Sequence, residues 1–306
     1  MFINLSNVNR AKLKKVSLMR NNNNTTYEVK ISPSMIESNK DINIVILNNR
    51  IVNFLNVLTK KCKNFDNSIF MRNFKNTKFD LSNLREDFCN RSQGNVEINK
   101  KDSKFTLNSF DATYHELLHL ASITYGNRRF TPFDEGYTQL LTERYFEENI
   151  SKSYPIQVFI LKSIEDLIGR EVLEKAYFEG KLTDIIIKYL PIPEGEKNFK
   201  KFIEANSLLF EIFESEDNVL DLKNEKVEEY FSYTQILLKD IYNFIFSCLK
   251  NKVSSIDYLE KELFLKKFTF LFSISINNVV IEVFDKNIFE DFIESELSRG
   301  ESTKKI

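Results

Sequence analysis

Tryptophan is absent from this 306-residue sequence, and glycine, proline, cysteine and histidine are scarce, with 7, 5, 3 and 2 residues. The few glycines form no loop that could cradle phosphate groups, which argues against nucleotide binding of that kind. The cysteines Cys62, Cys89 and Cys248 are odd in number and widely spaced, so we expect no disulfide framework. We interpret each cysteine as a small core residue.

An excess of either charge is also lacking, since 43 basic residues face 44 acidic ones and the net charge is −1. A balanced chain has no overall field that attracts nucleic acid or anionic lipid, so we expect no nucleic-acid partner. The longest uncharged stretch, Phe268–Ile281, is too short and too polar to span a bilayer. The first twelve residues contain no apolar signal core, and we therefore expect a cytoplasmic protein without a membrane span.

The two histidines lie four positions apart, at His115 and His119 in the run H-E-L-L-H, and Glu116 follows the first. On an α-helix such residues are about 40° apart around the axis and about 6 Å apart along it, so both imidazoles can bind one cation. Zinc accepts neutral imidazole nitrogen, and its catalytic sites have three protein ligands. Glu116 would lie beside the metal, where its carboxylate can take a proton from zinc-bound water.

The flanking sequence predicts a helix around this motif. Asn108 or Ser109 can cap its start, and Gly126 is a typical residue just past a helix end. An alternative interpretation is that His115 and His119 are ordinary histidines on a half-buried helix.

A third ligand must be an acid or a cysteine, because no third histidine exists. Thr131 and Pro132 predict the start of a second helix, which places Glu135 about 5 Å into it. If the two helices form an antiparallel hairpin, Glu135 lies at about the height of His119 and is the predicted third ligand. Gly136 would let the helices approach closely.

Glu143 lies eight residues further along the same predicted helix. Its carboxylate can orient a ligand histidine by a contact with the side of the ring that does not bind the metal, or it is a solvated surface acid. Both interpretations fit the sequence.

The runs H-E-L-L-H at 115–119 and F-D-E-G-Y-T at 133–138 resemble the gluzincin group of zinc metallopeptidases. Residues 135–146 are also similar to uncharacterised bacterial proteins of low-GC lineages. In the family, a second helix supplies a glutamate ligand within an N-E-G or D-E-G context. The resemblance covers about residues 111–146 only.

The resemblance implies that His115, His119 and Glu135 bind zinc and that Glu116 is the general base. It does not imply aminopeptidase activity, because no G-x-M-E-N segment precedes the motif. Peptide hydrolysis also needs a donor for the developing oxyanion. We predict Tyr154 for this role, chosen from the tyrosines and arginines near the motif: Tyr125, Tyr137, Tyr154, Arg128 and Arg129.

Before the motif, residues 1–40 are rich in asparagine and are expected to form a partly mobile N-terminal segment with a strand at Tyr27–Ile31. Ile42–Thr59 reads as a helix, preceded by a short strand in an alternative interpretation. Alternation in residues 95–107 predicts a β-hairpin. By resemblance to zincins this hairpin would pair with extended substrate, although a hairpin that only covers the helix fits the sequence equally well.

After the motif, the pattern predicts helices at Pro155–Ile168, Glu171–Phe178 and Leu182–Leu190. The run P-I-P-E-G at 191–195 indicates a boundary. Ile274–Phe284 is either helical or a hairpin through two asparagines, and periodicity does not decide between them.

The predicted fold class is mainly α (α+β). We expect a zincin-like catalytic domain at 41–190, with a small antiparallel sheet before the H-E-L-L-H helix, and a helical lobe at 196–306. The predicted function is a zinc-dependent metallopeptidase acting on a peptide or protein substrate. The alternatives are a catalytically silent zincin-like binding or regulatory protein and a zinc hydrolase of a non-peptide amide. Glu116 argues against the silent protein, since a binding module needs no general base.

Overall fold

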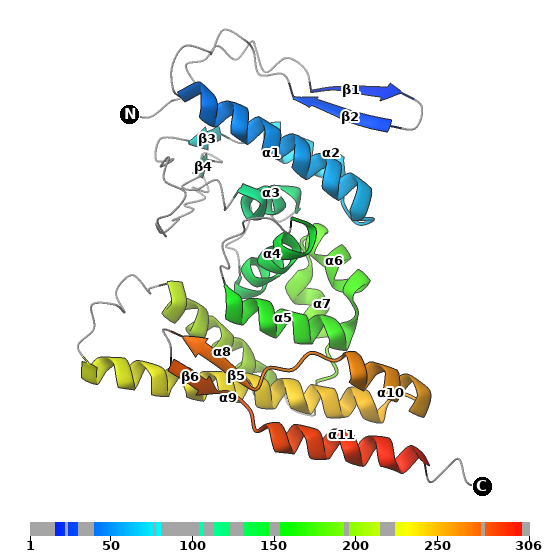
Figure 1. Cartoon of the computed structure of the whole chain (residues 1–306), viewed down its shortest axis with the longest axis vertical. Coiled ribbons are helices and arrows are strands. Elements are labelled where there is room, and N and C mark those ends of the chain that lie inside the picture. Colours follow the sequence, from blue (N-terminus) through cyan, green and yellow to red (C-terminus); the bar gives the residue numbers. More distant parts are fainter. Residues whose placement is uncertain are drawn as a thin grey trace. The chain divides into compact units, whose positions relative to one another are not determined.

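The computed structural model describes residues 16–21, 24–29, 40–75, 78–80, 104–106, 113–122, 131–146, 154–192, 196–214, 224–276 and 279–301. Helices dominate these ranges, which confirms the mainly α prediction (Figure 1). The helices are α1 (Lys40–Lys61), α2 (Asn67–Lys75), α3 (Thr113–Ala121), α4 (Pro132–Tyr145), α5 (Pro155–Ile168), α6 (Arg170–Phe178), α7 (Leu182–Tyr189), α8 (Glu196–Glu214), α9 (Asn224–Ser254), α10 (Tyr258–Lys267) and α11 (Lys286–Glu301).

The strands of the described ranges form two-stranded sheets. They are β1 (Val16–Asn21), β2 (Asn24–Val29), β3 (Lys78–Asp80), β4 (Lys104–Thr106), β5 (Ser273–Ile276) and β6 (Val279–Glu282). β1 pairs antiparallel with β2, and β5 pairs antiparallel with β6, with Ile274 opposite Ile281. The hairpin alternative for Ile274–Phe284 is therefore correct.

β4 differs from its prediction. Phe105 pairs with Phe79 of β3, and the two strands run parallel. The predicted hairpin partner around Val96 lies outside the described residues, as does the Asn108 or Ser109 cap. Pairing between segments so far apart in sequence leaves no local turn signal, so alternation alone could not identify β3 as the partner.

Two compact units make up the chain. The first consists of Met1–Arg129, Thr138–Ser153 and Tyr177–Gly180, and the second consists of Phe130–Tyr137, Tyr154–Ala176 and Lys181–Ile306. Both units contain parts of the range 41–190, and the second unit contains 196–306. The domain ranges stay sequence-based predictions.

The core of the first unit is built on α1. Ile51, Phe54, Leu55 and Leu58 recur at helical spacing and are almost completely buried. Phe54 stacks on Phe146 with ring centroids 5.6 Å apart. α1 and α2 both pack against α3, which holds α3 in the interior of this unit.

α3 ends earlier than the sequence predicted. The helix stops at Ala121, whereas Gly126 was the expected residue past its end and lies outside the described residues. The Ser122 hydroxyl donates to the His119 carbonyl at 3.1 Å, and Asn73 of α2 donates to the carbonyls of Leu120 and Ser122. These side chains satisfy the last carbonyls of the helix, a task that the prediction assigned to a glycine turn.

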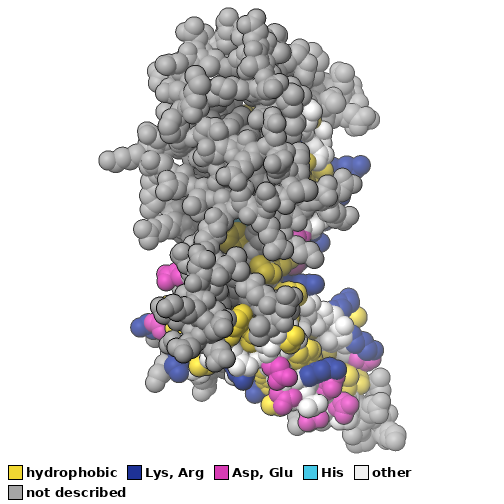
Figure 2. Space-filling view, turned by 60° about the vertical axis from the view of Figure 1, so that its left-hand side comes forward, with side chains coloured by type: hydrophobic (Ala, Val, Ile, Leu, Met, Phe, Trp, Pro, Cys, Tyr) yellow, Lys and Arg dark blue, Asp and Glu magenta, His cyan; other side chains and the backbone are white. Residues whose placement is uncertain are grey.

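The second unit is a helical lobe with a hairpin. α8 packs along α9, and α5 packs on α9 as well (Figure 1). Phenylalanines of α9, of α11 and of the segments that follow α10 and β6 pack into one cluster, in which Phe270 lies 4.9 Å from both Phe284 and Phe289 by ring centroids. Figure 2 shows side chains of both charges mixed with apolar ones over the described part of the visible surface.

The sequence predicted the bounds of the three helices after the motif to within one residue. α5 has the predicted bounds, α6 begins one residue earlier and α7 ends one residue earlier. Cys62 and Cys248 are buried core residues, as predicted, and Cys89 lies outside the described residues. In the part of the chain that the structure describes, no helix has the length and hydrophobicity needed to cross a membrane.

Gly136 of α4 allows close packing, although the neighbour is α5 and not α3 as expected. A Cβ atom on Gly136 would lie 2.6 Å from the Gln157 Cβ and 2.9 Å from the Gln157 main-chain carbon. Neither atom belongs to a flexible side-chain end. The position therefore accepts no side chain without a shift of α4 relative to α5.

The substitution Gly136→Ala should lower the free energy of unfolding. Helix propensity alone favours alanine by about 1 kcal/mol. Overpacking costs about 1–3 kcal/mol, and contact with main-chain atoms puts this case near the upper end, so we expect a net loss of about 2 kcal/mol. Urea denaturation measures the change, and a stabilised variant would contradict the packing argument.

Candidate metal centre

α3 carries the H-E-L-L-H motif into the interior. His115, Glu116 and His119 retain only 6%, 4% and 2% of their exposure. Charged and polar groups are rarely buried this deeply unless they are paired or bind a metal. The helix is thus more deeply buried than the alternative interpretation assumed, while burial alone is compatible both with metal ligands and with hydrogen-bonded core histidines.

The two imidazoles present the same nitrogen to each other. His115 Nε2 and His119 Nε2 lie 3.1 Å apart, and the ring planes are inclined at 76°. Two nitrogen ligands of a tetrahedral zinc ion, each about 2.0–2.1 Å from it, are separated by about 3.3 Å. The observed distance between the two Nε2 atoms is therefore close to the distance between two nitrogen atoms that bind the same zinc ion.

The start of α4 is fixed by reciprocal capping. The Asp134 carboxylate accepts from the Thr131 main-chain N–H at 2.9 Å, and the Asp134 N–H donates to the Thr131 hydroxyl at 3.2 Å. Pro132 occupies the first helical position. This capping box confirms the predicted helix start and sets which residues of α4 share a face.

Glu135, Thr138 and Gln139 lie on one face of α4, since three or four residues make about one helical turn. Thr138 and Gln139 contact the Nδ1 atoms of the two histidines. The ligand atoms of His115, His119 and Glu135 all lie within 4.8 Å of one another, and these residues form a group that can hold a metal ion. Contacts of Thr138 and Gln139 with the histidines therefore show which face of α4 points to the site. The prediction had instead used the distances of His119 and Glu135 from the ends of their helices.

His115 is oriented by a chain of amide hydrogen bonds. The Gln139 amide nitrogen donates to Glu143 Oε1 at 3.2 Å, so the Gln139 carbonyl oxygen faces His115 Nδ1 at 3.1 Å. A carbonyl oxygen can only accept, so Nδ1 carries the proton and Nε2 offers its lone pair. Glu143 therefore contacts His115 through Gln139, a residue that the sequence analysis did not single out.

His119 has a different set of neighbours. The Thr138 hydroxyl lies 3.4 Å from His119 Nδ1 and 2.7 Å from the hydroxyl of Tyr177 on α6. Thr138 and Gln139 could have been found in the sequence by following the Glu135 face of α4. Tyr177 is 39 residues beyond Thr138, and no pattern in the sequence signals its position.

Among the other candidates, Tyr154 precedes α5 in a left-handed conformation, with φ 53° and ψ 42°. Its ring stacks on Phe210 with centroids 5.6 Å apart. Its role as oxyanion donor stays a prediction. The Tyr137 hydroxyl donates to Glu165 at 2.7 Å. Tyr125, Arg128 and Arg129 lie outside the described residues.

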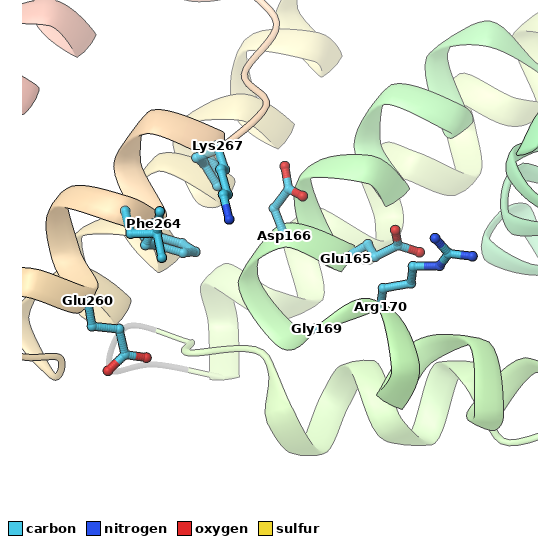
Figure 3. Close-up of a pocket in the computed structure, with 9 residues that line it drawn as sticks. Glu165, Asp166, Gly169, Arg170, Glu260, Phe264 and Lys267 are labelled. Carbon is cyan, nitrogen blue, oxygen red and sulfur yellow. The ribbon is translucent and has the colours of Figure 1, made fainter.

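The second unit has an open pocket of about 290 Å³ between α5, α6 and α10 (Figure 3). Both acids and bases face it, and the lining consists of Glu165, Asp166, Gly169, Arg170, Glu260, Leu263, Phe264, Lys267 and Phe268. Burial raises the pKa of Asp166, which also accepts the Thr269 N–H at 2.7 Å. Glu165 accepts from Tyr137. The more buried carboxylates of this pocket thus accept hydrogen bonds from other residues of the second unit. We assign no ligand to this pocket.

Comparisons of this chain with known protein families, curated proteins and solved structures find no match. The assignment of the site therefore depends on its own geometry.

Replacing Gln139 with leucine should weaken metal binding. The substitution removes the acceptor that keeps the His115 proton on Nδ1, and loss of such a partner typically lowers metal affinity about 10–100-fold. Competition with a chromophoric chelator measures the affinity. The same substitution at Gln235, which donates to the Glu282 carbonyl, is the control and should have no effect. Equal affinities for both variants would contradict the assigned role of Gln139.

Proposed function

We propose that this protein is a zinc-dependent metallopeptidase, with His115, His119 and Glu135 as ligands and Glu116 as general base. The observation that carries the proposal is the pair of buried Nε2 atoms 3.1 Å apart, together with a Glu135 oxygen that lies within 4.8 Å of a ring nitrogen of each histidine. Two imidazole nitrogens and one carboxylate are a donor set that zinc uses in catalytic sites, leaving one position for water or substrate. The resemblance of residues 115–119 and 133–138 to gluzincins supports the same assignment.

The roles follow from the chemistry of each side chain. Zinc in this site supplies the Lewis acid that polarises the substrate carbonyl and makes water more acidic. Glu116 is next to His115 on α3 and points about 100° away from it around the helix axis. Its carboxylate takes a proton from the attacking water and passes it to the leaving amine. Gln139 holds His115 in the tautomer that this arrangement needs.

The presence of Glu116 favours an enzyme over a structural metal site. A site that only stabilises a fold needs ligands and no carboxylate beside them, and burying a further acid costs free energy. Glu116 is 4% exposed. A catalytically silent protein and a hydrolase of another amide are the two rival outcomes of the test.

The test combines metal content with hydrolysis. Purified wild-type protein should contain about one zinc per chain by elemental analysis, and Glu135→Ala should lose it. Glu116→Gln should retain zinc but hydrolyse a peptide library at least about 100-fold more slowly, because a general base contributes about 10²–10⁴-fold. Glu204→Ala is the control, since this glutamate is exposed on α8.

Four outcomes separate the possibilities. Wild type without zinc after metal-replete expression would overturn the proposal. Zinc without peptide hydrolysis would favour the silent protein, and hydrolysis of non-peptide amides alone would favour the third interpretation. Iron in place of zinc would also count against it, because two histidines and one carboxylate bind iron in oxygenases.

A further inference from the structure

Tyr177 connects to the metal centre through the hydroxyl of Thr138. It lies on α6, is 2% exposed, and its hydroxyl is 2.7 Å from the hydroxyl of Thr138. Thr138 in turn lies 3.4 Å from His119 Nδ1. The contact between the two hydroxyls is the shorter one, so Tyr177 is the closer partner of Thr138.

The direction of these hydrogen bonds follows from metal binding. A neutral imidazole that offers Nε2 to a metal keeps its proton on Nδ1. His119 Nδ1–H can then donate to the Thr138 hydroxyl oxygen, 3.4 Å away. The proton of Thr138 has to turn elsewhere, and the Tyr177 oxygen at 2.7 Å can accept it.

We propose that Tyr177 is a positioning residue for the metal ligand His119, acting through Thr138 as the acceptor of its hydroxyl proton. This inference rests on the proposed metal-binding function. Without Tyr177, the Thr138 proton turns toward His119 Nδ1 and favours the tautomer that carries its proton on Nε2. That tautomer cannot bind a metal through Nε2.

The metal-free protein has a complementary arrangement. His115 Nε2 carries a lone pair because Gln139 accepts its Nδ1 proton, so His119 Nε2–H can donate to it across 3.1 Å. Tyr177 then donates to Thr138, and Thr138 donates to His119 Nδ1. Metal binding moves His119 from the Nε2–H to the Nδ1–H tautomer, with no net gain or loss of protons by the ring. Both hydroxyls rotate, and the Tyr177–Thr138 hydrogen bond reverses.

The affinity test compares zinc binding by chelator competition in wild type, Tyr177→Phe, Thr138→Val and Thr138→Ser. Loss of a partner of a metal-binding histidine typically costs about 10–100-fold, and we expect Tyr177→Phe and Thr138→Val to fall in this range. Thr138→Ser keeps the hydroxyl and should stay within about twofold of wild type. The double variant Tyr177→Phe/Thr138→Val should be no weaker than Thr138→Val alone, because Tyr177 acts only through Thr138.

A control removes a hydroxyl of no consequence for the site. Tyr242 on α9 is fully buried, and its hydroxyl has no hydrogen-bond partner among the described residues. Tyr242→Phe should bind zinc like wild type. If Tyr177→Phe also does so, Thr138 sends its proton elsewhere and the inference is wrong. An additive loss in the double variant would likewise overturn it, since Tyr177 would then act by general packing.

Histidine ¹⁵N NMR tests the tautomers directly, because the chain contains only two imidazoles. Metal-free wild type should show His115 protonated on Nδ1 and His119 protonated on Nε2, and zinc should shift His119 to Nδ1. An Nδ1–H tautomer of His119 before zinc is added would contradict the reversal. Failure of wild type to bind zinc would instead refute the proposed function and the inference together, so the two failures are distinguishable.

Discussion

Two buried imidazole nitrogens that face each other at 3.1 Å are the constraint on which the candidate centre depends. Lone pairs at this distance repel unless a proton or a cation lies between them, and water cannot relieve the repulsion inside a packed unit. Each ring must therefore be held by its other nitrogen. Gln139 contacts Nδ1 of His115, and Thr138 contacts Nδ1 of His119. The short distance between the two Nε2 atoms thus explains why each Nδ1 has a polar neighbour.

α4 serves two purposes at adjacent positions. Glu135 lies on the same face of α4 as Thr138 and Gln139. The next residue, Gly136, packs its backbone so closely against Gln157 that no side chain fits there. The capping box at Thr131 fixes where the helix begins and hence its rotation. A rotation of α4 by one residue would bring a side chain against Gln157 and would turn both histidine partners away. The close packing at Gly136 thus helps to set the direction of Glu135.

The parts of this arrangement that were predicted from the sequence have local causes. Thr131 and Pro132 mark a helix start, and the spacing of His115 and His119 defines one face. The parts that were missed depend on partners distant in sequence. Asn73 satisfies carbonyls at the end of α3 across 47 residues, so no local glycine is needed there. The parallel pairing of Phe79 with Phe105 likewise has no signal within either strand.

The absence of matching proteins does not weaken the chemical argument for the site. The resemblance to gluzincins covers about residues 111–146, a small part of the chain, and a short motif contributes little to a comparison over 306 residues. Metal binding depends on a few atoms at defined distances, and unrelated folds can supply the same constellation. Here the two histidines and Glu135 are brought together, and a buried acid lies beside them. Glu116 is 4% exposed and follows His115 directly on α3, and burying a carboxylate costs free energy. General-base catalysis, the role proposed for Glu116, needs a carboxylate at such a position beside the two histidines.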